Sequence, residues 1–442
     1  MNTLEMIKEA GVIGAGGAGF PTHVKLNAKA DYLLLNGAEC EPLLRVDQQL
    51  MARHPEEVLA GLAAAQEITG AGKVIIGIKE SHPDVIRIMK DAIRAAGLAD
   101  TFSVGTLPNV YPAGDEQVLV YELTGRIVPE TSIPISVGCV VINAETAANV
   151  YRAVSGIPVT LKYVTVTGDV PNPVTLKVPV GTPLQLLFEY AGRTDLTGYE
   201  VINGGPMMGP LLTPQDKYVT KKTKGLIVLP GDHRLVMLKK RSMSSARKLN
   251  RSACEQCSIC TDLCPRHLLG HSTAPHKMVR AMAYGMPASE KTATALTCCQ
   301  CNLCEYYSCP AGIQPKMANV YYMGLDREAG IKKAPLPEYR AVPQREMRMV
   351  PSARLIERLR LREYNVPAPL IEEKVVIPDY VGIGLHDHVG APAVPAVREG
   401  DRVSRGQKIA EPPEGALGCP VCSSIDGTVE AIDGGNIIIR RA

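Results

Sequence analysis

Along the first hundred residues, short apolar runs alternate with stretches in which apolar residues recur at the spacing of a helix. Short apolar runs are typical of buried strands, and each is followed by a stretch with helical periodicity. Pro55 and Pro83 stand where helices begin, each beside acidic residues, and Gly97 supplies a C-terminal stop. The pattern predicts a βαβα unit with a parallel sheet. Its segments are 32–35, 55–69, 74–78 and 83–96.

Beyond this unit the pattern changes twice. Short β-branched runs between 158 and 230 predict a small β-rich region, and a Pro- and Arg-rich stretch predicts a connector with a helix near 352–361. Gly-Asp and Asp-Gly turns after residue 380 predict a compact β region. We therefore expect a multidomain α/β protein. Its predicted regions are 1–157, 158–235, 236–335, 336–378 and 379–442.

Length and composition agree with several domains. Single cores stop growing near about 250–300 residues, and this chain has 442. No apolar run is long enough to span a bilayer, and residues 1–11 lack the apolar core of a secretory signal. Thirteen clustered cysteines indicate metal ligation in a reducing compartment, so we expect a cytoplasmic protein that does not span the membrane. With no Trp and three Phe, nucleic acid is not an expected partner.

Eight cysteines form two motifs of the bacterial ferredoxin type. The first reads C-x2-C-x2-C-x3-C and the second C-x2-C-x2-C-x4-C, and a proline follows each. Three thiolates in one short loop bind one face of a 4Fe-4S cluster, and in two-cluster ferredoxins the fourth comes from the other motif. We therefore predict crossed ligand sets. They are Cys254, Cys257, Cys260 and Cys309 for cluster one, and Cys298, Cys301, Cys304 and Cys264 for cluster two.

Zinc is the alternative metal, but structural zinc sites favour C-x2-C pairs at wider separation. Cys299 is out of register and is expected to be a packing residue or to lie behind the ligands. The lone pair Cys419 and Cys422 lacks a helix N-terminus that would lower a thiol pKa, so no catalytic role is expected. The roles of Cys40 and Cys139 stay open.

A basic stretch, 239–251, precedes the first cysteine motif. It contains six Lys or Arg residues and no acid. It is either a solvated helical or linker face, or a docking surface for an acidic electron-transfer partner.

A glycine-rich segment near the N-terminus can bring backbone close to a phosphate or a ring. It contains Gly14, Gly16, Gly17 and Gly19, and it precedes the first strand, so it is not a Rossmann dinucleotide fingerprint. Taken alone, it is also compatible with a turn that packs on the sheet.

Three later segments give this loop its context, at 36–42, 111–116 and 142–146. In order and spacing the four segments resemble the flavin-binding subunit of respiratory complex I. The resemblance implies FMN over the glycine loop and NADH as electron donor. The implied flavin contacts are Lys25, Asn36, Glu39, Gly114, Asn143 and Thr146, and Phe20 and Glu116 match positions that flank the nicotinamide or adenine.

The chain departs from that subunit at several positions. Ala15, Ala38 and Cys40 replace the family's Arg, Asp and Ser, and no second aromatic residue follows Lys25. These changes point to a weaker or remodelled adenine site.

Over its whole length the chain resembles the C subunit of the Rnf complex. With a segment like a barrel-sandwich hybrid at the C-terminus, it is more similar to the cobalamin reductases of propanediol-utilisation microcompartments. The resemblance implies an α/β flavin domain, a β-grasp SLBB-like domain, a helical two-cluster ferredoxin-like domain and a lipoyl-like domain. It implies electron transfer from NADH to cobalamin, reactivating a B12-dependent diol dehydratase. It further implies a microcompartment location, with a cobalamin-handling enzyme, a shell protein or an adenosyltransferase as partner. The competing hypothesis is a soluble Rnf-type adaptor that passes electrons to a protein without acting on cobalamin.

Overall fold

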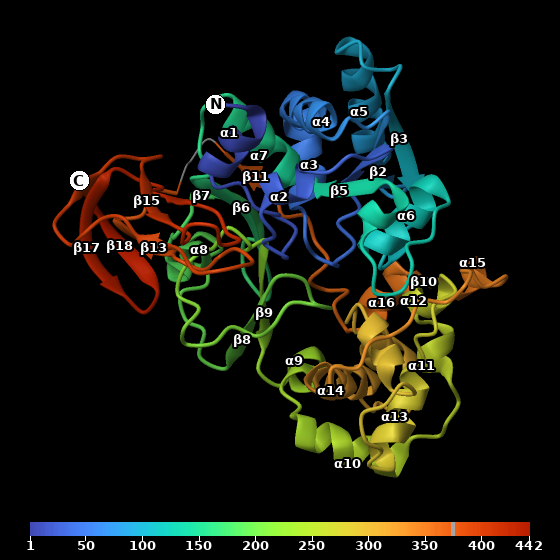
Figure 1. Ribbon diagram of the computed structural model, residues 1–442. Coiled ribbons are helices and arrows are strands. Elements are labelled where there is room, and N and C mark those ends of the chain that lie inside the picture. Colours follow the sequence, from blue (N-terminus) through green and yellow to red (C-terminus); the bar gives the residue numbers. More distant parts are fainter. Residues whose placement is uncertain (373–375) are drawn as a thin grey trace.

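The computed structural model describes residues 1–372 and 376–442, so residues 373–375 of the predicted connector lie outside the described part. The N-terminal region contains a parallel sheet in the order β3-β2-β1-β5 (Figure 1). Its strands are β1 (Tyr32–Asn36), β2 (Lys73–Lys79), β3 (Phe102–Leu107) and β5 (Cys139–Asn143). Its helices are α1 (Thr3–Glu9), α2 (Thr22–Leu26), α3 (Val46–Arg53), α4 (Pro55–Thr69), α5 (Pro83–Ala95), α6 (Glu116–Thr124) and α7 (Ala144–Val154).

Alternation along β1 explains the three layers of this region. Leu33 and Leu35 pack with residues of α4, α5 and α7, whereas Leu34 packs with residues of α6 on the other face. Gly61 of α4 lies against the backbone of Ala147 of α7, where a Cβ atom would stand 1.8 Å from the carbonyl oxygen. The predicted βαβα unit is confirmed, and both α4 and α5 begin with the expected proline.

The second region is a five-stranded sheet in the order β11-β7-β6-β9-β8, with one helix beside it. The edge strand β11 comes from the predicted connector and pairs in parallel with β7. The connector is therefore part of this sheet as well as a link. The elements are β6 (Leu161–Gly168), β7 (Val174–Pro179), α8 (Leu184–Tyr190), β8 (Tyr199–Asn203), β9 (Gly225–Pro230) and β11 (Leu370–Ile371).

The cysteine-rich region is helical and lies at the end of the molecule opposite α4 and α5 (Figure 1). Met278, Val279 and Tyr322 contribute to its core. Its longer helices are α9 (Arg234–Lys239), α10 (Met243–Ala253), α13 (Pro275–Ala283) and α14 (Pro315–Glu328). Its short helical segments are α11 (Ile259–Asp262), α12 (Pro265–Leu268), η2 (Ala293–Thr297) and η3 (Leu303–Ser308).

The connector returns the chain to the N-terminal region. It contains α15 (Arg345–Arg348) and β10 (Val350–Pro351), which pairs with β4 (Val110–Tyr111). The helix expected at 352–361 is α16 (Ser352–Arg358). It stops early because Arg360 has a positive φ of 59°.

Two small sheets form the C-terminal region. Their orders are β12-β18-β17-β14 and β13-β15-β16. The strands are β12 (Tyr380–Gly384), β13 (Val394–Pro395), β14 (Arg402–Val403), β15 (Lys408–Glu411), β16 (Val421–Cys422), β17 (Gly427–Asp433) and β18 (Asn436–Arg441). Among the described residues, no helix combines the length and apolar character needed to cross a membrane.

Candidate cluster and flavin sites

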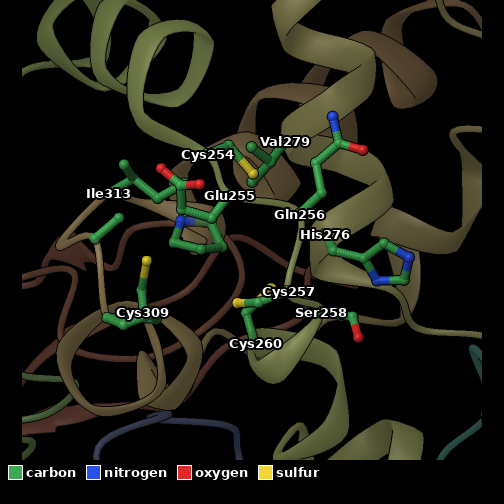
Figure 2. A pocket seen from close by; sticks show the side chains of 13 residues that line it. Cys254, Glu255, Gln256, Cys257, Ser258, Cys260, His276, Val279, Cys309 and Ile313 are labelled. Atoms are coloured by element: carbon green, nitrogen blue, oxygen red, sulfur yellow. The ribbon is translucent and has the colours of Figure 1, made fainter.

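The eight motif cysteines line two separate pockets. Each pocket takes three cysteines from one motif and one from the other, which is the crossed arrangement that the spacing predicts. The first contains Cys254, Cys257, Cys260 and Cys309 (Figure 2). The second contains Cys264, Cys298, Cys301 and Cys304.

Both cysteine loops share an unusual backbone conformation. The residue before the second cysteine is left-handed in each loop, with φ of 54° at Gln256 and 56° at Gln300. The residue after that cysteine is also left-handed, with φ of 59° at Ser258 and 61° at Asn302. Each such non-glycine residue costs about 1–3 kcal/mol. The paired bends curl three thiols toward one centre, and binding of a cluster there would offset their cost.

Burial keeps these thiols protonated unless a metal centre binds them. Burial, reinforced by Cys309 and Cys257, raises the pKa of Cys260 to about 12. Burial and the nearby Cys299 likewise raise the pKa of Cys264 to about 12. Thiolate ligands therefore require a metal centre that stabilises their negative charge.

Each cysteine pocket is lined by four thiols that come from both motifs. Within residues 1–372 and 376–442, no three His, Cys, Asp or Glu side chains are placed to hold one metal ion. A cubane cluster binds four cysteines through different iron atoms, so its ligands stand farther apart than those of zinc. The four thiols that line each cysteine pocket suit the four iron atoms of a 4Fe-4S cluster.

The second pocket touches the N-terminal region directly. Tyr111 donates a hydrogen bond to the carbonyl oxygen of Cys301, at 2.9 Å. Arg266, two residues after Cys264, pairs with Asp115 at 2.8 Å, and both side chains are nearly buried. Because Asp115 lies between the predicted flavin residues Gly114 and Glu116, the second cysteine set adjoins the candidate flavin site.

That flavin site lies at the carboxyl end of the parallel sheet, where open α/β folds bind their ligands. Asn36 at the end of β1 is the register partner of Asn143 at the end of β5. The Asn36 amide donates to the carbonyl oxygen of Gly114 at 2.8 Å. Thr146, in the first turn of α7, accepts a hydrogen bond from Ala15 of the glycine loop at 2.9 Å. The structure thus brings the four predicted segments together.

The glycine loop closes on itself and leaves one face open. Gly14 donates to the carbonyl oxygen of Phe20 at 2.9 Å. Gly17 has a φ of 109°, and a Cβ atom there would meet nothing within 4 Å. Gly16 faces Asn143, with 3.7 Å between a built Cβ and that side chain. The loop offers the bare backbone that a closely approaching planar or phosphate group needs.

The C-terminal region supports the loop from the other side. Val389 donates a hydrogen bond to the carbonyl oxygen of Gly19 at 2.9 Å. A Cβ atom on Gly19 would lie 2.8 Å from both the Asp387 backbone oxygen and the Lys222 side chain. These contacts were not predictable from the sequence, because Asp387 and Lys222 carry no motif.

Charged groups surround the flavin site, and several were missed. Lys25 and Glu116, which the sequence predicts at separate positions of the site, form an ion pair at 2.6 Å. Glu39 accepts a hydrogen bond from the backbone of Asp47 at 3.0 Å, and burial together with Asp47 raises the pKa of Glu39. The unpredicted Lys224 forms a buried ion pair with Asp47, which also accepts a hydrogen bond from Asn143 at 2.8 Å.

Lys79 places a cation at the edge of the parallel sheet. It ends β2 and is 6% exposed, and no described residue accepts a hydrogen bond from its ammonium group. Burial lowers its pKa. The charge of Glu39 acts on Lys79, and the hydrogen-bond donors of its ammonium group have no acceptor among the described residues, which suits an anionic group at this edge of the sheet.

A hydrogen bond with Cys301 lowers the pKa of Cys299, whereas burial raises the pKa of the other four cysteines outside the motifs. Cys299 lines the second pocket beside the ligands, in agreement with a supporting position. Burial raises the pKa of Cys419 to about 11 and raises that of Cys422. Cys139 is buried in β5, and burial with Glu41 raises the pKa of Cys40 to about 12.

The basic stretch divides into two parts. Lys239 donates to the carbonyl oxygen of Gly209 at 2.6 Å, and Lys240 pairs with Glu200 at 2.5 Å, so its first part stabilises the fold. Lys248 and Arg251 are exposed on α10, the helix that ends directly before Cys254. The helical face that the sequence predicts is therefore present only in the second part.

Comparison with known families covers most of the chain. The matching family models are the Nuo51 FMN-binding domain at 7–152, the SLBB domain at 163–211, the 4Fe-4S dicluster domain at 253–314 and the RnfC barrel sandwich hybrid domain at 368–439. These matches confirm the predicted fold class and the predicted order of domain types.

Curated relatives match over the whole length. The chain is 44% identical to "Cobalamin reductase PduS" of Citrobacter freundii and 43% identical to that of Salmonella typhimurium. Each alignment covers 99% of this chain and 96% of the relative. The C subunit of the Na(+)-translocating ferredoxin:NAD(+) oxidoreductase complex of Acetobacterium woodii is 37% identical, over 60% of this chain and 58% of that protein.

Proposed function

Because the chain belongs to the family of the cobalamin reductase PduS, we propose that it passes electrons from NADH through FMN and two 4Fe-4S clusters to cobalamin. The observation that carries this proposal is the contact between the flavin site and the second cysteine set, through Tyr111 and Asp115. FMN, when bound, exchanges electron pairs with a nicotinamide and single electrons with iron–sulfur clusters.

Each residue set has an assigned task in this proposal. The glycine loop presents its backbone to FMN, and Asn36, Asn143 and Thr146 hold the surrounding segments in place. Lys25 and Glu116 hold one another beside the loop, and Phe20 and Glu116 flank the nicotinamide. The crossed cysteine sets hold the clusters, so neither motif can form a complete site without the other. No side chain is required as a general acid, base or nucleophile.

Anaerobic reconstitution tests the function. Protein loaded with iron, sulfide and FMN should reduce aquacobalamin when NADH is the only reductant, with the absorbance change of the corrinoid as readout. A protein with full iron and flavin content that reduces ferricyanide with NADH, but leaves aquacobalamin oxidised, would show that cobalamin is not its acceptor.

An Rnf-type adaptor is the second candidate. The exposed cations Lys248 and Arg251 lie on α10, the helix that ends directly before Cys254, and they favour a docked acidic protein. This candidate predicts reduction of a protein acceptor that weakens strongly with added salt. Reduction of free aquacobalamin that is insensitive to salt would count against it.

The finer assignments of place and partner rest on the family. We propose a location inside a bacterial microcompartment, with a shell protein or an adenosyltransferase as partner. Co-purification with isolated microcompartments tests this location. We also propose the domain limits 157, 235, 335 and 378, which limited proteolysis would check.

A further inference from the structure

A second cavity lies directly beside the first cysteine pocket. It has a volume of about 250 Å³ and lies between α10 and α13. Cys254, Gln256 and Val279 line both this cavity and the cysteine pocket. In Figure 2 the Gln256 side chain points away from the sulfur atoms. A ligand in the cavity would therefore be separated from cluster one by the wall that Cys254 forms.

The charge of the cavity is positive. Arg251 of α10 and Arg280 of α13 line it from the two helices, and no carboxylate lines it among the described residues. Neither arginine forms an ion pair with any residue of the described ranges. Glu255, the nearest acid in sequence, lines the cysteine pocket instead. Two guanidinium groups without an acidic partner are suited to bind a phosphate.

An aromatic ring stands at the same cavity. Tyr284 follows α13 and is 71% exposed, whereas Tyr322 of the same region is fully buried. An aromatic ring so exposed contributes little to the core, but it offers a flat apolar face for a ring of a ligand. The inner wall is rigid, because the Asn250 amide is hydrogen-bonded to Gln314 in both directions, at 3.2 Å and 3.0 Å.

The size of the cavity limits what it can hold. Pockets that enclose a whole drug-sized ligand measure about 300–1,000 Å³, so this one is too small for a macrocycle. It suits an arm of a larger molecule, with one phosphate for the arginines and one flat ring for Tyr284.

We propose that this cavity, which we call the arginine cavity, binds the nucleotide arm of cobalamin. That arm combines a phosphodiester, a ribose and a dimethylbenzimidazole ring. Arg251 and Arg280 bind the phosphodiester, and Tyr284 stacks on the benzimidazole. The corrin ring then lies outside the cavity, over the exposed Cys257 edge of cluster one. This inference rests on the proposed function, since it assigns a binding site to that function's acceptor.

Cobinamide, which lacks the nucleotide arm, makes the test specific. Binding of cyanocobalamin and of dicyanocobinamide is measured by equilibrium dialysis with the reconstituted protein. The variant Arg251→Gln with Arg280→Gln should weaken cyanocobalamin binding by about 10- to 100-fold, and leave cobinamide binding unchanged. The matched control is Lys248→Gln with Lys277→Gln, which removes the same charge from exposed positions of the same two helices. It should bind both corrinoids as the natural protein does.

The outcomes separate the inference from the function. Iron content and EPR spectra of each variant verify that the clusters are intact. The arginine cavity is rejected if the arginine variant binds cobalamin normally, or loses both corrinoids equally. It is also rejected if the lysine control loses as much, which would indicate a general basic surface for an acidic protein. If the natural protein binds neither corrinoid and reduces neither, the proposed function fails together with the inference.

Discussion

The phenol of Tyr111 and the backbone carbonyl of Cys301 form a buried hydrogen bond that joins the flavin-type region to the second cysteine loop. Tyr111 ends β4 and is the first residue of the segment 111–116, which contains Gly114 and Glu116. Burial and Glu41 raise the pKa of Tyr111 well above its ordinary value, so the hydroxyl stays protonated and can donate. The contact fixes the second cysteine set, rather than the first, next to the flavin site.

Tyr111→Phe tests this contact. The substitution leaves the Cys301 carbonyl oxygen without its donor in a buried position, which should cost about 1–3 kcal/mol of unfolding free energy. Urea unfolding followed by cluster absorbance measures the loss. Tyr190→Phe is the control, because Tyr190 is 43% exposed and no described residue is its hydrogen-bond partner. Equal stability of the two variants would show that the contact contributes nothing.

Single substitutions of the fourth ligands test the crossed sets. Cys264→Ala should damage the cluster held mainly by the second motif, and Cys309→Ala the cluster held mainly by the first. Each variant should retain roughly half the iron, because the other ligand set is complete. EPR of the reduced protein would show which signal is lost. Loss of the first-motif signal in Cys264→Ala would contradict the crossing, and Cys139→Ala, outside both pockets, should retain all the iron.

The buried pair Lys224 and Asp47 gives a prediction about the flavin site. Burial alone would lower the pKa of Lys224, but the carboxylates of Asp47 and Glu39 raise it, so the pair is charged. Lys224→Met should cost about 3–5 kcal/mol because it leaves a buried carboxylate without its cation. It should also lower the flavin content of the purified protein.

A double variant provides the control for this prediction. Asp47→Asn combined with Lys224→Met removes both charges, so urea unfolding should recover much of the lost stability. If the double variant is as unstable as Lys224→Met, the loss comes from packing and not from the unpaired charge.

His82 makes the stability depend on pH. Burial, together with Lys79 and Arg45, lowers its pKa to about 4 in the folded chain, against an ordinary value of 6.5. Between these two values the unfolded chain binds more protons, so His82 makes the folded state less stable as the pH falls from 6.5 toward 4. His82→Gln should lose less stability over that interval in urea unfolding. Above pH 7 the two curves should run parallel, and a parallel course below pH 6 would contradict the assignment.

Local sequence patterns predicted two features of this structure: the first strands and helices, and the grouping of the cysteines. Apolar runs and N-terminal prolines located β1, α4, β2 and α5 because those signals lie within each segment. The cysteine spacing predicted which four thiols share each pocket, since ferredoxin loops bind in a fixed geometry.

Contacts between distant segments were beyond the reach of these patterns. Lys224 reaches Asp47 across 177 residues, and Arg266 reaches Asp115 across 151. Neither pair has a characteristic spacing, because its geometry depends on how whole domains pack. The strand β11 was also missed, since two residues of a proline-rich segment carry no strand period and gain their structure from β7.

The contact between the C-terminal sheets and the first helix has a consequence for chain order. Lys408 of β15 pairs with Glu9 at the end of α1, at 2.5 Å, and Lys221 donates to the carbonyl oxygen of Gly11 while lying against Pro420. A barrel-sandwich module that already rests on α1 can be joined to the chain in front of α1 by a short linker, with its contacts kept. A circularly permuted chain that carries this module ahead of α1 would keep these contacts, so the order of the domains along the chain can change without a rebuilt interface.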